Sequence, residues 1–239
     1  MTIPPVSIAK QSVEELGGPH SVLVRQRRDH LELHQLLHRI ATTTDDAERQ
    51  EVLTRLCRLV FPHAFAEEAV LWPIVRRTLP DGHDLTLRIE REHQQINELF
   101  SALERTRPGD GQHENLFESI ARLLREDVRD EEDVLLPRLQ QALRADALRR
   151  IGWMWELVRR TAPTRPHPVV SRRLPGNALA ALPLTGLDRA RDRLDRAARR
   201  TPAPLATGCR GTSRTLAAAA AAIEHLPPLR SGEDPSTRT

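Results

Sequence analysis

The chain has 239 residues, of which 39% are hydrophobic, 29% are charged and only 3% are aromatic, with no Tyr. This length allows one large domain or one domain with an extension, and the shortage of aromatic residues argues against an aromatic-rich β-sandwich and against a base-stacking surface. No run approaches the roughly 18 apolar residues of a membrane-spanning helix, and the N-terminus lacks the charged and apolar regions of a secretory signal.

The net charge of +3 is unevenly distributed, since residues 1–162 carry −4 and residues 163–239 carry +7. We therefore divide the chain into an N-terminal arm (1–18), a helical domain (19–161) and a basic extension rich in Pro and Ala (162–239). The two cysteines, Cys57 and Cys209, are far apart and have no metal-binding spacing. They are expected to be reduced thiols in a cytoplasmic protein, with Cys57 serving as a small core residue.

Residues 19–160 repeat apolar side chains every three or four positions, which predicts amphipathic helices. Four stripes stand out: Leu33, Leu36, Leu37 and Ile40; Val52, Leu56, Leu59 and Val60; Ile89, Ile96, Leu99 and Leu103; Leu116, Ile120, Leu123 and Leu124. The breaks at 42–46, 80–82 and 108–111 are short, so neighbouring helices should be antiparallel. A fifth helix is predicted at about 145–160.

The extension differs from this pattern. Five prolines in 161–183 predict a linker that is not helical throughout. Residues 184–200 could form an Arg-rich amphipathic helix, residues 213–226 an Ala-rich helix, and residues 227–239 are expected to be disordered. Thirteen Arg after position 162 could contact nucleic acid, an anionic membrane surface or an acidic partner. Without a helix-turn-helix signature or interleaved aromatic residues, we favour an arm that docks on the helical domain.

An internal repeat organises the helical domain. EEAVLWP at 67–73 matches EEDVLLP at 131–137, and RDH at 28–30 matches REH at 91–93. Two copies of a helical hairpin predict an all-α fold, an up-down-up-down four-helix bundle followed by the fifth helix and the extension.

The repeat places ionisable residues where a bundle should be apolar. His63 and Glu67 are four residues apart and so share one helix face, as do their counterparts Asp127 and Glu131. Antiparallel packing can bring these residues to one level with histidines of the first and third helices. Buried carboxylates without partners are costly, and a pair of divalent cations removes that cost. The predicted metal ligands are His30, His63, Glu67, His93, Asp127 and Glu131.

The pattern His-x-x-x-Glu-Glu-x-x-Leu-x-Pro at 63–73, preceded by Asp-His at 29–30 and followed by Glu-His at 92–93, resembles the haemerythrin/HHE cation-binding family over about residues 20–144. The resemblance implies a four-helix bundle with a non-haem di-iron centre and bridging carboxylates, hence two iron ions per chain, with Mn or Zn as other candidates. Family members bind O₂, sense oxygen, iron or nitric oxide, or consume peroxide. The motif's ligand positions carry over to His30, His63, Glu67, His93 and Glu131.

Two positions depart from that family pattern. Asp127 stands where the family usually has His, and Asn97 stands where a second His would follow His93. Asp127 could be a ligand, an acceptor for another ligand, or the remnant of a lost one. A harder, more anionic donor set favours ferric iron or Mn²⁺, which predicts a poor O₂ carrier.

Other histidines and carboxylates leave alternatives. His34 or His38 could replace His30, although the repeat favours His30, and Glu68 and Glu132 could either support ligands or be solvated. The remaining histidines are expected to have no special role: His20, His83, His113, His167 and His225.

The function predicted first is a metal-binding protein that senses or handles O₂, NO, peroxide or iron, with no catalytic residues assigned. The alternatives are a di-iron peroxidase or catalase-like enzyme and a metal-free interaction scaffold. The expected partner is a small diatomic or peroxide ligand at the metal site, no clear nucleic-acid partner and no membrane span are indicated, and the oligomeric state is left open.

Overall fold

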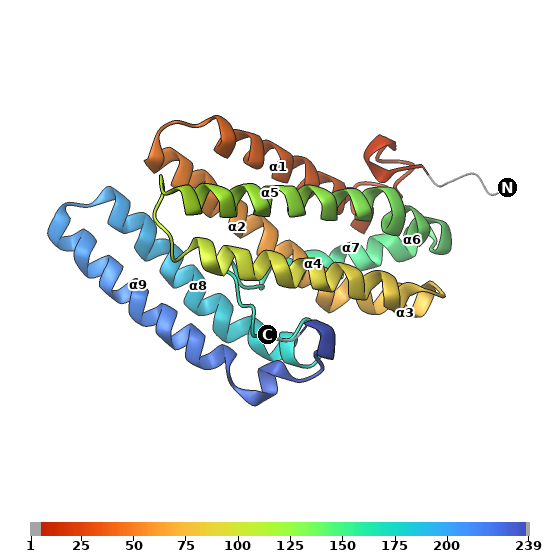
Figure 1. Ribbon diagram of the computed structural model, residues 1–239. Coiled ribbons are helices and arrows are strands. Elements are labelled where there is room, and N and C mark those ends of the chain that lie inside the picture. The colour runs from red at the N-terminus through yellow and green to blue at the C-terminus, as the bar shows by residue number, and fades with distance from the viewer. Residues whose placement is uncertain (1–5, 238–239) are drawn as a thin grey trace.

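The computed structural model describes residues 6–237, which form helices and turns without a β-strand. This confirms the predicted all-α class (Figure 1). The helices are α1 (Val22–Thr42), α2 (Asp46–Ala66), α3 (Trp72–Thr78), α4 (Gly82–Leu103), α5 (Gly111–Asp130), α6 (Leu136–Ala142), α7 (Ala145–Arg160), α8 (Gly176–Arg200) and α9 (Ala203–Glu224). Within residues 6–237, no helix is both long and apolar enough to cross a bilayer.

Two helical hairpins form the core of the structure, α1 with α2 and α4 with α5. Polar side chains at the helix starts explain where α1 and α2 begin. The Ser21 hydroxyl accepts the backbone N–H of Leu23, and the Asp45 carboxylate accepts that of Glu48 at 2.7 Å. Each bond satisfies one backbone N–H that a helix start leaves unpaired.

Both repeat motifs contain a π-helical turn, at Glu67–Leu71 and at Glu131–Leu135. In each, the backbone N–H of the following residue, Trp72 or Leu136, bonds to the carbonyl of the glutamate five residues earlier. Proline comes next at 73 and 137, where its missing N–H is tolerated because an α-helix is restarting there. Each π-helical turn is an α-helix with one inserted residue, a feature that often occurs at functional sites.

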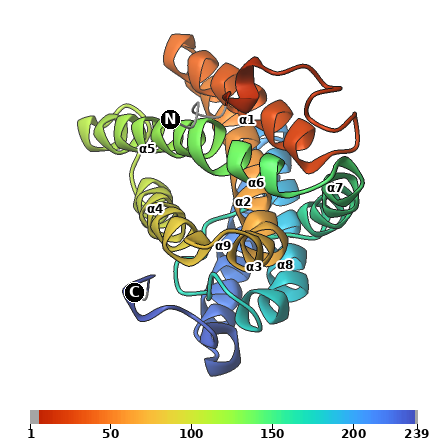
Figure 2. The same ribbon diagram turned by 90° about the vertical axis from the view of Figure 1, so that its right-hand side faces the viewer.

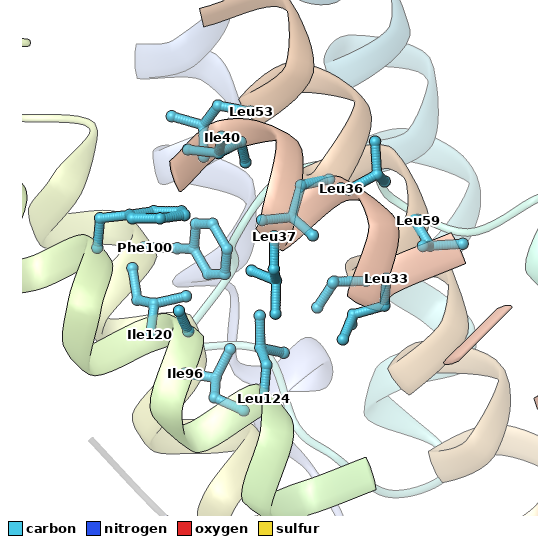
Figure 3. Close-up of a cluster of buried hydrophobic side chains, with 14 of the residues drawn as sticks. Leu33, Leu36, Leu37, Ile40, Leu53, Leu59, Ile96, Phe100, Ile120 and Leu124 are labelled. Atoms are coloured by element: carbon cyan, nitrogen blue, oxygen red, sulfur yellow. The ribbon is translucent and has the colours of Figure 1, made fainter. Parts of the chain in front are cut away.

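Two hydrophobic clusters pack the helices. The first joins α1, α2, α4 and α5, and Figure 3 shows its side chains pointing toward one another, Leu37, Leu53, Phe100 and Ile120 among them. The partly buried Cys57 packs against this cluster, and burial raises the pKa of its thiol, as expected for a core residue. The second cluster joins the N-terminal arm, the start of α1, both π-helical turns, α3, α6 and α7.

The helix α7 packs on α1 and α2 and closes the second cluster with the fully buried Trp155. At Gly152 the helix lies directly against the backbone at the start of α1. A Cβ atom there would lie 2.1 Å from the carbonyl oxygen of His20 and 2.8 Å from the backbone nitrogen of Val22. Only glycine fits this contact, which fixes α7 against the start of α1.

The extension forms an antiparallel hairpin, α8 with α9, which lies along the domain beside α2 and α4 (Figures 1 and 2). Its helices begin earlier than the sequence indicated, at Gly176 and Ala203, and α8 contains Pro183. The lost backbone hydrogen bond falls in a turn whose Leu179 and Leu182 are exposed, where water can satisfy the free carbonyl.

Residues 227–237 form short 3₁₀ turns with Leu229 and Thr237 buried, where disorder was expected. Residues 238–239, and residues 1–5 of the N-terminal arm, lie outside the described part.

Polar contacts hold the extension together and attach it to the domain. The ring of His167 lies 3.0 Å from Asp188 on α8 and 3.5 Å from Glu224 on α9, while Arg165 pairs at 3.2 Å with Glu104, directly after α4. Burial alone would lower the pKa of His167, but the two carboxylates raise it to about 9. His167, for which no role was expected, is thus a structural residue of the extension.

Substituting Gly152 with Ala should lower the free energy of unfolding by about 3 kcal/mol or more, because the methyl group collides with backbone atoms that cannot move independently. The matched control is Gly186→Ala in α8, where a Cβ meets nothing within 4 Å. That change should raise stability by about 0.5–1 kcal/mol. Urea unfolding of both variants measures the difference, and equal effects would contradict the contact at Gly152.

The His167 contacts should make stability depend on pH. Because its pKa is raised on folding from 6.5 to about 9, the stabilisation is fully present below pH 6.5 and is lost as the pH rises through 9. We expect His167→Gln to be clearly less stable than the wild type at pH 6 and nearly equal to it at pH 9.5. Thermal unfolding across this range measures the difference, and a constant gap would show that His167 is not charged in the fold.

Candidate metal centre

All six predicted ligands converge in a layer between the two hydrophobic clusters. Ligand atoms of His30, His63, Glu67 and Glu131 lie within 4.8 Å of one another, and so do those of His93, Asp127 and Glu131. Glu131 is a member of both groups. The side chains come from α1, α2, α4, α5 and the two π-helical turns, so each hairpin contributes to the layer.

The two glutamates lie between the histidines. One oxygen of Glu67 is 3.1 Å from His63 Nε2, and the other is 3.7 Å from His93 Nε2. His30 Nε2 is 3.2 Å from Glu131 Oε2, and Asp127 Oδ1 is 3.7 Å from His93 Nε2. The carboxylates therefore face both groups, an arrangement in which one carboxylate can contact two cations.

Each histidine is held from behind by a carboxylate. The Nδ1 atoms of His30, His63 and His93 lie 2.9, 3.3 and 2.9 Å from Glu132, Asp29 and Glu68, in that order. We call these three acids the outer carboxylates. A carboxylate at Nδ1 places the ring proton on that nitrogen and leaves the lone pair of Nε2 free to bind a metal, as is common for histidines that bind metals.

The contacts of the outer carboxylates show the roles of Glu68 and Glu132, which the sequence left open, and add Asp29 to the site. Glu68 is buried and Glu132 has 14% of its side chain exposed, so both support histidines and neither is simply solvated. Asp29 was not assigned a role from the sequence. Its position directly before His30 was visible, but it supports His63 on the neighbouring helix, a contact that no local pattern reveals. Arg28 and Arg159 pair with Asp29 at 3.0 and 3.5 Å.

The fit of a metal can be judged from the polar atoms that face the layer. Both carboxylate oxygens of Glu67 and of Glu131, one oxygen of Asp127 and Nε2 of His30 are buried without a hydrogen-bond partner among the described residues. Such atoms are rare in folded proteins and costly. Three imidazoles and three carboxylates match the preferences of iron, manganese or zinc, so the residues fit a divalent or trivalent cation.

The pKa values of the clustered side chains also favour a bound cation. Burial lowers the pKa of a histidine, yet nearby carboxylates raise it to about 9 for His30 and about 10 for His63. Burial, together with the charges of Glu67 and Asp127, raises the pKa of Glu131 to about 8. Without a cation the layer is therefore held together by shared protons, which metal binding would displace.

A cavity of about 30 Å³, the size of one water molecule, adjoins the layer. Apolar side chains such as Leu33, Phe61 and Ile96 line it together with the ligand side chains and Asn97. The amide nitrogen of Asn97 donates to the carbonyl of His93 at 3.0 Å, and its oxygen accepts the backbone N–H of His167 at 3.1 Å. Asn97 is thus engaged with backbone and is not positioned as a ligand.

The other histidines lie apart from the layer. His34 and His38 are exposed on α1, which favours His30 as the repeat predicted. His20 stacks on Trp153, with ring centroids 4.8 Å apart, and the buried His113 bonds to the Thr106 hydroxyl at 2.8 Å.

Comparison with known proteins agrees with this geometry. Residues 21–139, about half of the chain, match the family model of the haemerythrin HHE cation-binding domain. No curated protein and no solved structure matched the chain. The matched segment contains α1 to α5, the start of α6, both π-helical turns and all six predicted ligands. Residues 21–139 of this chain therefore belong to the haemerythrin HHE family of cation-binding domains.

Proposed function

We propose that this protein holds two iron ions in the layer between its hydrophobic clusters and senses or handles O₂, NO, peroxide or iron. The proposal is carried by the surroundings of the three histidines. In each, an outer carboxylate contacts Nδ1, while Nε2 faces buried carboxylate oxygens that have no hydrogen-bond partner among the described residues. The proposed scaffold is an up-down-up-down bundle of α1, α2, α4 and α5 within residues 19–161, with an arm before it and the basic extension after it.

The residues would divide between two positions. His30 and His63 would hold one ion and His93 and Asp127 the other, while Glu67 and Glu131 would contact both. Bound iron would supply redox chemistry toward oxygen, peroxide or nitric oxide. The protein's own part is to exclude bulk water with the apolar walls of the small cavity and to hold each imidazole in its metal-binding tautomer.

The donor set favours sensing or storage over reversible O₂ carriage. Asp127 adds a third carboxylate to the layer, and Asn97 adds no imidazole, since both ends of its amide bond elsewhere. Anionic oxygen donors stabilise ferric iron. A stable, reversible oxygenated spectrum of the ferrous protein would contradict this part of the proposal. Repeated turnover of peroxide would favour the enzyme alternative, because a sensor changes state once per event.

The first test is metal content. Protein purified without chelator should contain about two irons per chain and absorb in the near ultraviolet, and protein reconstituted anaerobically with ferrous iron should reach the same iron content and absorb there once air has oxidised it. Glu67→Ala and Glu131→Ala should each lose most of this iron, since both residues face both groups. Glu118→Ala, which removes an exposed carboxylate of α5, should retain it. No stoichiometric metal in the wild type would instead support the metal-free scaffold.

The substitution Glu131→Gln should raise the stability of the metal-free protein but reduce the stabilisation that bound iron provides. In protein stripped by chelator, Glu131→Gln removes a buried negative charge that faces Glu67 and Asp127, so it should raise stability at pH 8 by about 1 kcal/mol or more. Ferrous iron at about 1,000 times its Kd should stabilise the wild type by about 4 kcal/mol and the variant far less. Thermal unfolding of the four samples measures this, and a stripped variant that is less stable than the wild type would refute the charge argument.

A further inference from the structure

The extension reaches the metal layer at one histidine, His93. Arg172, in the segment before α8, is 7% exposed although it carries a full charge. Its Nη1 atom lies 3.8 Å from Glu68 Oε1, and that same oxygen lies 2.9 Å from His93 Nδ1. Arg172 also donates from Nε and Nη2 to the Gln94 side-chain oxygen at 3.2 and 2.7 Å, which fixes the plane of its guanidinium group.

A second link, made of two hydrogen bonds, joins the extension to the backbone of His93. The N–H of His167 donates to Asn97 Oδ1 at 3.1 Å, and the Asn97 amide donates to the carbonyl oxygen of His93 at 3.0 Å. The segment 167–172 thus holds the ring of His93 through Glu68 and its carbonyl through Asn97. Pro168 adds a carbonyl that accepts from Gln94 on the same helix at 3.0 Å.

The other two histidines have no such connection among the described contacts. Asp29, behind His63, pairs with Arg28 and Arg159, which belong to α1 and α7. Glu132, behind His30, lies in the π-helical turn, and no contact with the extension is seen there. Only one of the two proposed ion positions is therefore supported by residues after 161.

We propose that Arg172 is a positioning residue for His93, and that docking of segment 167–172 and metal binding at the His93 position reinforce each other. The proposal rests on the proposed function. The guanidinium of Arg172, fixed by its two bonds to Gln94, lies beside Glu68 Oε1 and holds that oxygen where it contacts His93 Nδ1. Outer partners of this kind change metal affinity by about 10–100-fold. By linkage, metal must strengthen docking of the segment by the same factor.

The neighbouring residue offers a matched control. Arg173 also reaches a buried carboxylate of α4, pairing with Glu90 at 2.7 Å. Glu90 has a second arginine partner, Arg76, and among the described residues it makes no contact with any of the six ligands. Arg173→Gln removes the same charge one position away without touching the Glu68–His93 pair.

The experiment is anaerobic titration of the full-length chain with ferrous iron, followed by the amount of metal bound at each free iron concentration. In Arg172→Gln we expect the first ion to bind as in the wild type and the second about 10–100-fold more weakly. Arg172→Lys should recover part of the loss, since it restores the charge but not the paired bonds to Gln94. Arg173→Gln should match the wild type. Circular dichroism confirms that each variant is folded.

The reverse direction is tested by limited trypsin digestion. Bound iron should slow cleavage at the extension arginines of the wild type and of Arg173→Gln by tenfold or more, and should have little effect in Arg172→Gln. The proposal is overturned if Arg172→Gln keeps both affinities and its protection, or if it weakens both ions equally, which would indicate general destabilisation. A wild type that binds no iron overturns the proposed function and this inference together, whereas a wild type that binds two ions with an unaffected variant overturns the inference alone.

Discussion

Burial of charge in the middle of a helical core is the constraint on which the rest of this structure depends. Six ionisable side chains lie between two hydrophobic clusters, where unpaired charges are costly. Histidines face the inner carboxylates, the outer carboxylates face the histidines, and arginines pair with two of the outer carboxylates, Asp29 and Glu68. Because Arg159 and Arg172 supply part of this compensation, the site involves α7 and the extension as well as the hairpins.

This layering explains the abundance of buried arginine contacts. Asp29 is compensated from α1 and α7, Glu68 from the segment before α8, and Glu90 from both α3 and that segment. A guanidinium group suits these positions because it stays charged when buried and donates in a fixed plane. The basic character of the extension therefore has a structural use, because several of its arginines form ion pairs with carboxylates of the helical domain.

The sequence predicted that the six innermost residues converge and offered Glu68 and Glu132 as possible supports, but it did not reveal the rest of their surroundings. The repeat identified His30, His63, Glu67, His93, Asp127 and Glu131 because helical spacing reports which residues share a face. Asp29 and Arg172 were missed because their partners lie on other elements, and nothing in local periodicity encodes that packing. The π-helical turns were missed because an inserted residue rotates the apolar stripe that follows it, and the short helices α3 and α6 are too brief for that rotation to show in the sequence. The early starts of α8 and α9 reflect tertiary packing that overrides the proline and glycine signals.

The two π-helical turns have a consequence for the history of the fold. A π-helical turn is an α-helix with one additional residue, and the two turns occupy equivalent places in the two hairpins, 64 positions apart. Duplication of a hairpin that already contained the additional residue would leave this pattern. Two separate insertions would have had to occur at the same position of both hairpins. The duplicated unit would then have been a half-site that became complete only when a second hairpin, first another molecule and later its own copy, closed over it.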